Sequence, residues 1–305
     1  MSIKYRINQI NVAGRQLIKR FINAESDLLL TGRLLSEMVK SKKSINSLEE
    51  IEFKVFSQFG DDGIIQWLVY KLDIRSKTFI EFGVEDYRES NTRFLLMNNN
   101  WSGLILDGSK KNIDRVINSE YYWKYDLTAI SEFVTKDNIN SVISQYGFLH
   151  DCGLLHIDID GNDYWIWKEL SINPEIVILE YNSVFGKNRA ITVPYRDDFD
   201  RTKAHSSNLY FGASLKALVQ LSNNKGYAFI GCNSAGNNAY FIRRDLLCEE
   251  VSELSVEEGY VESKFRESRD SKNKLTYISG KDRIILIAEM PVYNTENNKL
   301  ETIKI

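Results

Sequence analysis

The sequence predicts a doubly wound α/β protein, with a mostly parallel seven-stranded sheet that ends in an antiparallel hairpin. From about residue 52 onward, segments with strand-like and helix-like patterns alternate regularly, which is typical of parallel sheets covered by helices. Short apolar runs at 104–106, 154–155 and 176–179 have the composition of strands buried on both faces. A chain of 305 residues can bury a substantial core around such a sheet.

The expected elements follow from local patterns. The first helix opens with the glycine-acid cluster of "FGDDG" and repeats apolar residues at helical spacing through Leu72. Thr135 is expected to cap a helix within "KDNINSVISQY", and Gly226 to stop another. Strands are expected at 78–83, 102–108, within 125–134, 153–160, 175–182, and in "YAFIGC" and "AYFIRR" around the turn "NSAGNN". Further helices are expected at 90–99, about 110–119, 163–170 and 213–226, with a polar loop at 183–211.

The chain divides into three expected regions: a helical arm (1–50), the α/β domain (51–247), and an extension that packs on that domain (248–305). In the arm, lysines and arginines interleave with apolar residues. This pattern indicates a helix packed on the body or on another subunit of a homo-oligomer. Peripheral contact with a membrane surface is one alternative, and disorder is another.

Composition excludes some classes of function. The net charge of −3 provides no basic field, so nucleic acid is not an expected partner. Cys152, Cys232 and Cys248 are widely spaced and form neither a metal-type pair nor a disulfide framework. No apolar run approaches the roughly 20 residues that span a bilayer, and the first residues lack a signal-peptide core. We therefore expect a cytoplasmic protein.

The stretch "FIEFGVED" (79–86) predicts a ligand site at a strand end. Gly83 lets the backbone approach a ligand closely, but a pyrophosphate would require several glycines. Glu81 and Asp107, which ends the next strand, instead suit S-adenosylmethionine, which carries a sulfonium, an ammonium and ribose hydroxyls. Alternatively, the two acids only cap strands or pair with arginines.

Several longer stretches, taken as a set, resemble the FkbM-like methyltransferases of sugar, polysaccharide and natural-product biosynthesis. They are "FSQFGDDGII", "IEFGVEDYRESNTRFLL", "WSGLILDGS", "FVTKDNIN", "LLHIDIDGNDYWIW", "VILEYNSVFG", "VPYRDDFDRTKAHSSNLYFGASLKAL" and "GYAFIGCNSAGNNAYFIRRDL", over residues 52 to 247. The resemblance implies a Rossmann-like class I methyltransferase fold and S-adenosylmethionine as cofactor. It assigns Glu81, Gly83 and Asn91 to the methionine end, Asp107 to the ribose, and Phe133 and Val134 to the adenine. The chain departs from the common pattern at Glu85, where a glycine often stands.

A group of acids is predicted near the cofactor. In "LLHIDIDGND", strand alternation puts His156, Asp158 and Asp160 on one side, and Glu180 ends the neighbouring strand. Asp158, Asp160 and Glu180 could hold Mg²⁺ or Mn²⁺, which would bind a substrate hydroxyl and lower its pKa. In the metal-free interpretation, Asp158 lies near the cofactor and Asp160 caps the following helix. His156, in mid-strand, is expected to be a hydrogen-bonded core histidine.

Methyl transfer to oxygen needs a base. His205, in the polar loop after the fifth strand, is the best candidate, with Asp158 next. His150 precedes the fourth strand at its far end and is not expected to take part. Candidate groups for holding a polar or anionic substrate are Tyr195, Arg201, Arg266 and Arg269. Alternatively, His205 is an exposed loop histidine, and the arginines are solvated surface charges.

The sequence thus predicts an S-adenosylmethionine-dependent O-methyltransferase that acts on a hydroxyl of a sugar, glycan or polysaccharide precursor. An NAD-dependent oxidoreductase is disfavoured, because the second and third glycines of its loop are missing. A non-catalytic nucleoside-binding or assembly module with the same fold is the alternative, since a fold does not fix a function.

Overall fold

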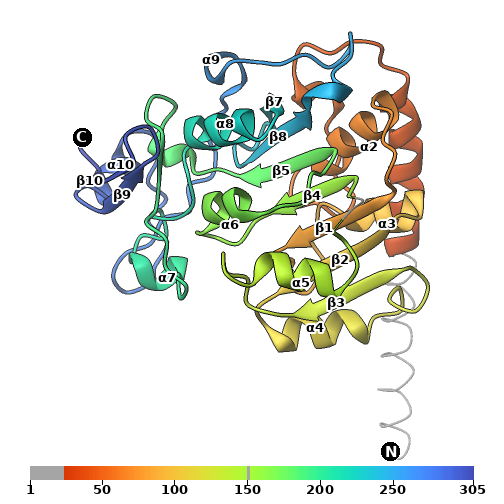
Figure 1. Cartoon of the computed structure of the whole chain (residues 1–305), viewed down its shortest axis with the longest axis horizontal. Helices are drawn as coiled ribbons and strands as arrows, with labels where there is room; N and C mark the ends of the chain where they lie inside the picture. The colour runs from red at the N-terminus through yellow and green to blue at the C-terminus, as the bar shows by residue number, and fades with distance from the viewer. Residues whose placement is uncertain (1–23, 150–151) are drawn as a thin grey trace, which may run out of the picture.

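The computed structural model describes residues 24–149 and 152–305, and its centre is a seven-stranded sheet (Figure 1). The strand order is β3-β2-β1-β4-β5-β8-β7. Strands β1 to β5 are parallel, while β8 runs antiparallel to both β5 and β7. This is the predicted Rossmann-like topology of class I methyltransferases. The strands are β1 (Thr78–Phe82), β2 (Ser102–Asp107), β3 (Leu127–Ser131), β4 (Leu154–Ile157), β5 (Ile176–Glu180), β7 (Tyr227–Cys232) and β8 (Asn238–Arg243).

Helices cover both faces of this sheet, because strand residues are buried on both sides and each face needs an apolar cover. One core cluster joins one face of the sheet to α2, α3 and α4. The other cluster joins the opposite face to α5, α6 and α8. These helices are α2 (Asp61–Lys71), α3 (Arg93–Asn99), α4 (Lys110–Ile117), α5 (Ile139–Gln145), α6 (Asp163–Glu169) and α8 (Leu215–Asn224).

A second, three-stranded sheet joins the predicted polar loop (183–211) to the C-terminal extension. In it, β6 (Ile191–Thr192) pairs with β9 (Pro291–Asn294), which pairs with β10 (Lys299–Thr302). Residues 183–211 also contain η2 (Ser183–Phe185) and α7 (Arg201–Ala204). A third apolar cluster holds this segment against the C-terminal extension, including Ile287 and Val292. The prediction of a loop was wrong, because apolar partners about a hundred residues away convert it into ordered structure.

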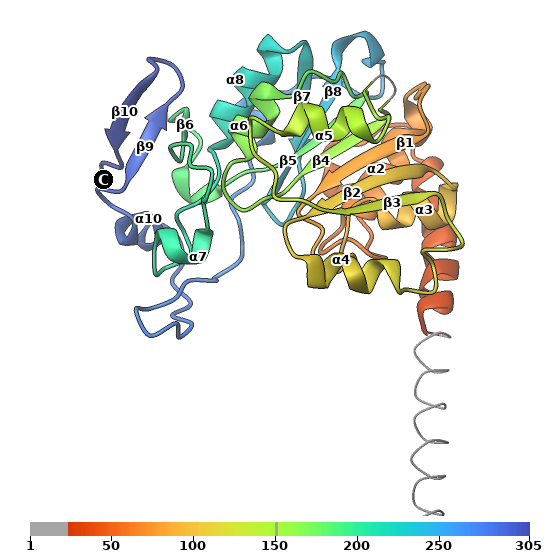
Figure 2. The ribbon, with the colours of Figure 1, turned by 60° about the horizontal axis from the view of Figure 1, so that its bottom comes forward.

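The smaller sheet and α10 (Asp282–Leu286) lie beyond the carboxyl ends of the parallel strands (Figures 1 and 2). The extension also contributes α9 (Val256–Gly259), which packs against β7. The C-terminal residues therefore stand on the side of the main sheet where ligands bind in open α/β folds.

Two boundaries differ from the sequence prediction in ways that bear on the site. Strand β4 ends at Ile157, so Asp158 and Asp160 lie in the following turn rather than in the strand. Asp160 has a φ of 56°, in the left-handed region, which breaks the expected alternation. Thr135 caps a turn just before α5, where its Oγ1 accepts a hydrogen bond from the backbone N–H of Asn138.

The described part of the arm, residues 24–40, is helical and packs on the body. Ser36 donates to Gln66, and Glu25 pairs with the buried Arg93 at 2.7 Å. The guanidinium of Arg93 lies between the rings of Phe56 and Tyr121. Residues 1–23, which carry most of the basic pattern, and His150 lie outside the described residues.

Within residues 24–149 and 152–305, no helix combines the length and the hydropathy needed to cross a bilayer. The three cysteines are free, and Cys152 and Cys232 are buried.

Candidate functional site

A cavity of about 390 Å³ opens at the carboxyl ends of β1, β2, β4 and β5, where the strand order reverses between β1 and β4. This is where open α/β sheets bind ligands, and the volume is in the usual range of small-molecule sites. We call it the first cavity. All seven residues predicted to bind the cofactor line it: Glu81, Gly83, Asn91, Phe133, Val134, Asp107 and Asp158.

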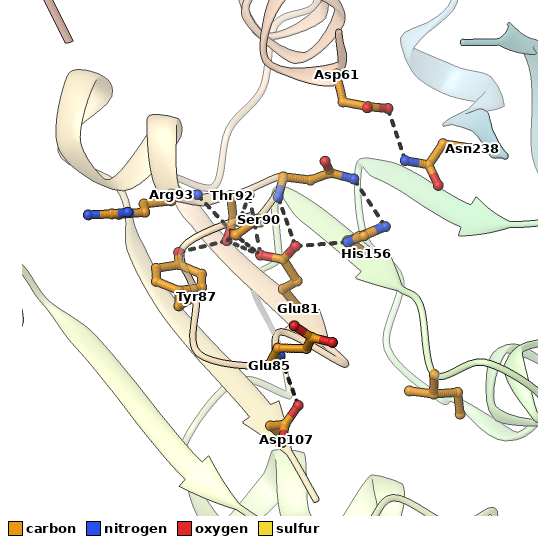
Figure 3. Close-up of polar contacts among 12 residues, drawn as sticks. Asp61, Glu81, Glu85, Tyr87, Ser90, Thr92, Arg93, Asp107, His156 and Asn238 are labelled. Carbon is orange, nitrogen blue, oxygen red and sulfur yellow. Dashed lines mark hydrogen bonds and ion pairs between the residues drawn. The ribbon is translucent and has the colours of Figure 1, made fainter. Parts of the chain in front are cut away.

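Glu81 is the centre of a buried hydrogen-bond network at the end of β1 (Figure 3). One carboxylate oxygen accepts from the backbone N–H of Asn91 and from His156 Nδ1, both at 2.9 Å. The other oxygen accepts from Ser90 Oγ at 2.6 Å and from the N–H and hydroxyl of Thr92. Burial raises the pKa of Glu81, but these donors, led by His156, lower it below its usual value. Glu81 therefore holds β4 and the start of α3 in position, with both oxygens engaged.

His156 is the buried, hydrogen-bonded histidine that the sequence predicts. Its Nδ1 contacts Glu81 and its Nε2 contacts the amide of Asn91 at 3.1 Å. Burial lowers the pKa of His156, but the hydrogen bond and charge of Glu81 outweigh burial and raise it. The network also orients Asn91, since that residue is bound through both its backbone and its side chain.

The loop after β1 contains residues with positive φ, although only one of them is a glycine. Gly83 has a φ of 76°, and a Cβ built there would lie 1.6 Å from the carbonyl oxygen of Asp158. Gly83 is thus required by the close approach of the turn that follows β4, in addition to any ligand. Glu85 has a φ of 46°, so the position where a glycine often stands keeps the left-handed geometry. Such non-glycine residues cost roughly 1–3 kcal/mol each and cluster at ligand sites.

Asp107 fastens that strained loop to β2. Its Oδ2 accepts from the backbone N–H of Glu85, and its Oδ1 from that of Ser109, both at 2.8 Å. The Glu85 contact is visible in Figure 3. A carboxylate oxygen has two lone pairs, so Oδ2 keeps acceptor capacity on the side of the cavity.

Asp158, Asp160 and Glu180 converge as predicted, with one carboxylate oxygen of each within 4.8 Å of the others. Burial and the charge of Asp160 raise the pKa of Asp158 to about 7. Burial and the charge of Asp158 raise the pKa of Glu180 well above its usual value. Asp158 and Glu180 therefore share a proton near neutral pH.

The metal-free role predicted for Asp160 was wrong. Asp163, not Asp160, accepts the backbone N–H groups of Ile159 and Gly161 before α6. Asp160 instead pairs with Arg201 at 2.7 Å. The turn that follows β4 frees Asp160 from the helix and directs it to α7.

A second cavity, of about 660 Å³, adjoins the first. Four residues line both cavities: Gln58, Glu180, Arg201 and Asn237. The predicted substrate residues Arg201, Arg266 and Arg269 all line the second cavity. The C-terminal extension supplies most of its outer wall, including Phe265, whose ring stacks on Phe59 with centroids 4.4 Å apart.

His205 and Tyr195 do not line either cavity. His205 Nδ1 is within 2.8 Å of Ser207 Oγ and also accepts the backbone N–H of Ser207, and burial lowers the pKa of this histidine. The Tyr195 hydroxyl donates to Asp197 and accepts from Lys136, and its ring packs near Trp165. Both side chains thus have partners within the loop, and the base and substrate roles expected for them from the sequence stay predictions.

Sequence reasoning also missed several lining residues, among them Gln58, Asn237 and Arg283. Gln58 stands directly before the glycine-acid cluster, which was interpreted only as the start of a helix. The carboxylate of Asp62 there accepts the backbone N–H groups of Val55, Phe56 and Ser57, and so shapes the turn that leads to Gln58.

The two cavities carry opposite charge. Around the first cavity stand one arginine, Arg201, and eight acids: Glu81, Glu85, Glu89, Asp107, Glu132, Asp158, Asp160 and Glu180. Burial, followed by the charge of Asp107, raises the pKa of Glu85, as expected where acids crowd together. The first cavity therefore suits a cationic ligand. Around the second stand two acids, Glu180 and Glu267, and five cations: Arg201, Lys264, Arg266, Arg269 and Arg283.

Comparison with known proteins adds the following. No protein-family model matches the sequence, and no curated protein is similar to it. Among solved structures, an S-adenosylmethionine-dependent methyltransferase from Clostridium acetobutylicum ATCC 824 has 10% identity and a TM-score of 0.38, over 60% of this chain and 89% of that one. The N-terminal domain of EvdMO1 with SAH bound has 10% identity and a TM-score of 0.39, over 69% and 94%. The O-methyltransferase from Bacillus cereus in complex with SAH has 13% identity and a TM-score of 0.36, over 55% of this chain and 73% of that one. The fold assignment itself rests on strand order and register.

We predict that Glu81→Gln lowers the free energy of unfolding by about 3 kcal/mol, because the amide NH₂ replaces an acceptor and leaves buried donors unpaired. Urea unfolding followed by circular dichroism measures the change. Glu120→Gln is the matched control, since Glu120 is exposed and its carboxylate faces Lys124 at 3.6 Å in the turn after α4. A Glu81→Gln protein as stable as the control would contradict the central role of this carboxylate.

Proposed function

We propose that this protein is an S-adenosylmethionine-dependent O-methyltransferase of the FkbM-like type, acting on a hydroxyl of a sugar, glycan or polysaccharide precursor. The observation that carries the proposal is the charge of the first cavity. Eight acids against two basic residues, Arg201 and His156, at the switch point of the sheet, suit a ligand with a sulfonium and an ammonium. Without a bound cation these acids repel one another, and this repulsion adds to burial in raising the pKa of Glu85.

The residues around the first cavity fit the parts of this cofactor. Asp107 keeps acceptor capacity for the ribose hydroxyls. Phe133 is about half exposed beside Gly108, as a side chain that covers an adenine would be, and Val134 is buried next to it. Asn91, oriented by Glu81 and His156, and the backbone of Gly83 would hold the methionine end.

A dinucleotide fits this cavity poorly. Its pyrophosphate would face the acids of the first cavity, and the loop after β1 offers one glycine where such a ligand needs several. This supports the methyltransferase over an NAD-dependent oxidoreductase. A non-catalytic module that binds the same nucleoside differs only in turnover, which mass spectrometry of candidate acceptors would measure.

The bound cofactor supplies an electrophilic methyl group; the protein must position the acceptor hydroxyl and take its proton. Asp158 is the proposed proton acceptor, because it lines the first cavity beside Glu180, which also lines the second. With a pKa of about 7, it is ionised in a substantial fraction of molecules at neutral pH. Glu180, in its protonated form, donates a hydrogen bond that stabilises the Asp158 carboxylate.

A divalent metal held by Asp158, Asp160 and Glu180 is the second candidate chemistry, supported by their convergence within 4.8 Å. One contact favours the metal-free form: Arg201 already neutralises Asp160 at 2.7 Å. We therefore propose that Asp158 acts without a metal.

Asp107→Ala should weaken S-adenosylmethionine binding by about 1–3 kcal/mol, the value of charge-assisted hydrogen bonds to the ribose and of the anchored loop. Isothermal titration calorimetry measures it. Asp114→Ala, an exposed acid on α4 that pairs only with Lys110, is the matched control and should bind normally. Equal affinity of the two folded variants would remove Asp107 from the cofactor site.

Asp158→Asn should reduce turnover by about 10²–10⁴-fold, the range for loss of a general base. Because the ionised form accepts the proton, wild-type turnover should rise with pH through about 7 and level off above it. The variant should lose this rise. His205→Ala tests the base predicted from the sequence: if it abolishes the pH rise and Asp158→Asn does not, the assignment must be reversed.

EDTA should leave turnover within about twofold of the untreated enzyme, because the proposed proton transfer needs no metal. Turnover is measured after dialysis against the chelator, with elemental analysis of the same sample. Loss of activity in EDTA with recovery on added Mg²⁺ or Mn²⁺ would establish the metal site at Asp158, Asp160 and Glu180 instead.

A further inference from the structure

The second cavity contains a buried cation that has no ion-pair partner among the residues that the structure describes. Arg283, on α10, lines this cavity, yet its side chain is only 8% exposed. One of its terminal nitrogens donates to the carbonyl oxygen of Ser263 at 3.2 Å, and its buried Nε has no hydrogen-bond partner. No carboxylate among the described residues forms an ion pair with it. Burial lowers the pKa of Arg283, and this effect outweighs the charge of Glu262, which opposes it. Because a buried charge is costly unless it is paired, a bound anion would stabilise the Arg283 guanidinium.

Arg266 and Arg269 are held in place by groups that leave their charge largely uncompensated. They donate to backbone carbonyl oxygens, those of Tyr277 and Asn273. Arg269 also faces an acid of the cavity wall, Glu267, at 3.5 Å. Backbone carbonyls orient a guanidinium without neutralising it, so these arginines keep donors and charge for a ligand.

At the junction between the two cavities, the charge of the lining residues changes sign. Arg201 is fixed there by Asp160, by the carbonyl oxygen of Asn208 at 2.7 Å, and by the ring of Phe211. Glu180 lines both cavities. The charge therefore changes sign across the junction, from acids around Asp158 to arginines beyond Arg201.

We propose that the second cavity binds an oxyanion of the acceptor, held by Arg283 together with Arg201, Arg266 and Arg269, so that the acceptor is an acidic sugar or a sugar phosphate. This inference deepens the proposed function and rests on it for the word acceptor. The carboxylate of an acidic sugar and the phosphate of an activated sugar share the chemistry that arginine recognises, namely paired oxygens that accept several N–H groups.

The test is calorimetric titration of the full chain, saturated with SAH, with sodium glucuronate, glucose 1-phosphate and neutral glucose. At least one of the two anions should bind about tenfold or more tightly than glucose, and its affinity should fall when salt rises from about 0.1 to about 0.5 M. Arg283→Met should lower the affinity for that anion by about tenfold or more. Lys299→Met removes the same charge from an exposed position on β10, outside both cavities, and should change nothing.

The anion that binds more tightly shows whether the acceptor carries a carboxylate or a phosphate. If neither anion binds better than glucose, or if Arg283→Met binds the anion like wild type, the proposal is overturned. Should Arg283→Met fail to fold, Arg266→Gln at an exposed position of the same wall carries the test, with a smaller loss expected.

A separate titration with S-adenosylmethionine keeps the two proposals distinguishable. Cofactor binding without Arg283-dependent anion binding would retain the methyltransferase and remove the anion subsite. Arg283-dependent anion binding without cofactor binding would retain the subsite and remove the methyltransferase.

Discussion

The contact between Glu81 and His156 is the constraint on which the rest of the site depends. A carboxylate that is only 2% exposed would destabilise the fold by several kcal/mol if it were left alone. It is tolerated because donors from two distant parts of the chain surround it: His156 from β4, and Ser90, Asn91 and Thr92 from the segment before α3. The same contacts fix the relative positions of β1, β4 and α3, and the first cavity lies between these elements.

Around that network the protein accumulates features that do not stabilise the folded chain. Glu85 takes a left-handed conformation, and Asp158 and Glu180 hold carboxyl groups whose pKa values are raised by burial and by one another. Arg283 adds a buried positive charge on the other side of the junction. Strain and uncompensated charge of this kind are common at functional sites, where a ligand of opposite charge relieves them.

Much of this arrangement could be predicted from the sequence, because it follows from local patterns. The apolar runs predict parallel strands, and the acids at their carboxyl ends must then meet at one edge of the sheet. Glu81, Asp107, Asp158 and Glu180 were found in this way, and all four line the first cavity. The end of β4 was misplaced, because a turn begun at Asp158 keeps the composition of a strand.

The sequence by itself determined the order of strands and helices and the edge where the acids gather, since both depend on hydrophobic periodicity and on the geometry of parallel pairing. Only the tertiary structure decided which charged side chains face a cavity. In the folded chain, His205 contacts Ser207, and both carboxylate oxygens of Glu81 accept hydrogen bonds. Arg283 of the extension lines the same cavity as Arg201 of the segment 183–211. These outcomes depend on packing between segments far apart in the chain, through the apolar cluster that joins residues 183–211 to the C-terminal strands. No local pattern encodes such contacts, because a loop residue's partners are set by where the rest of the chain leaves room for it.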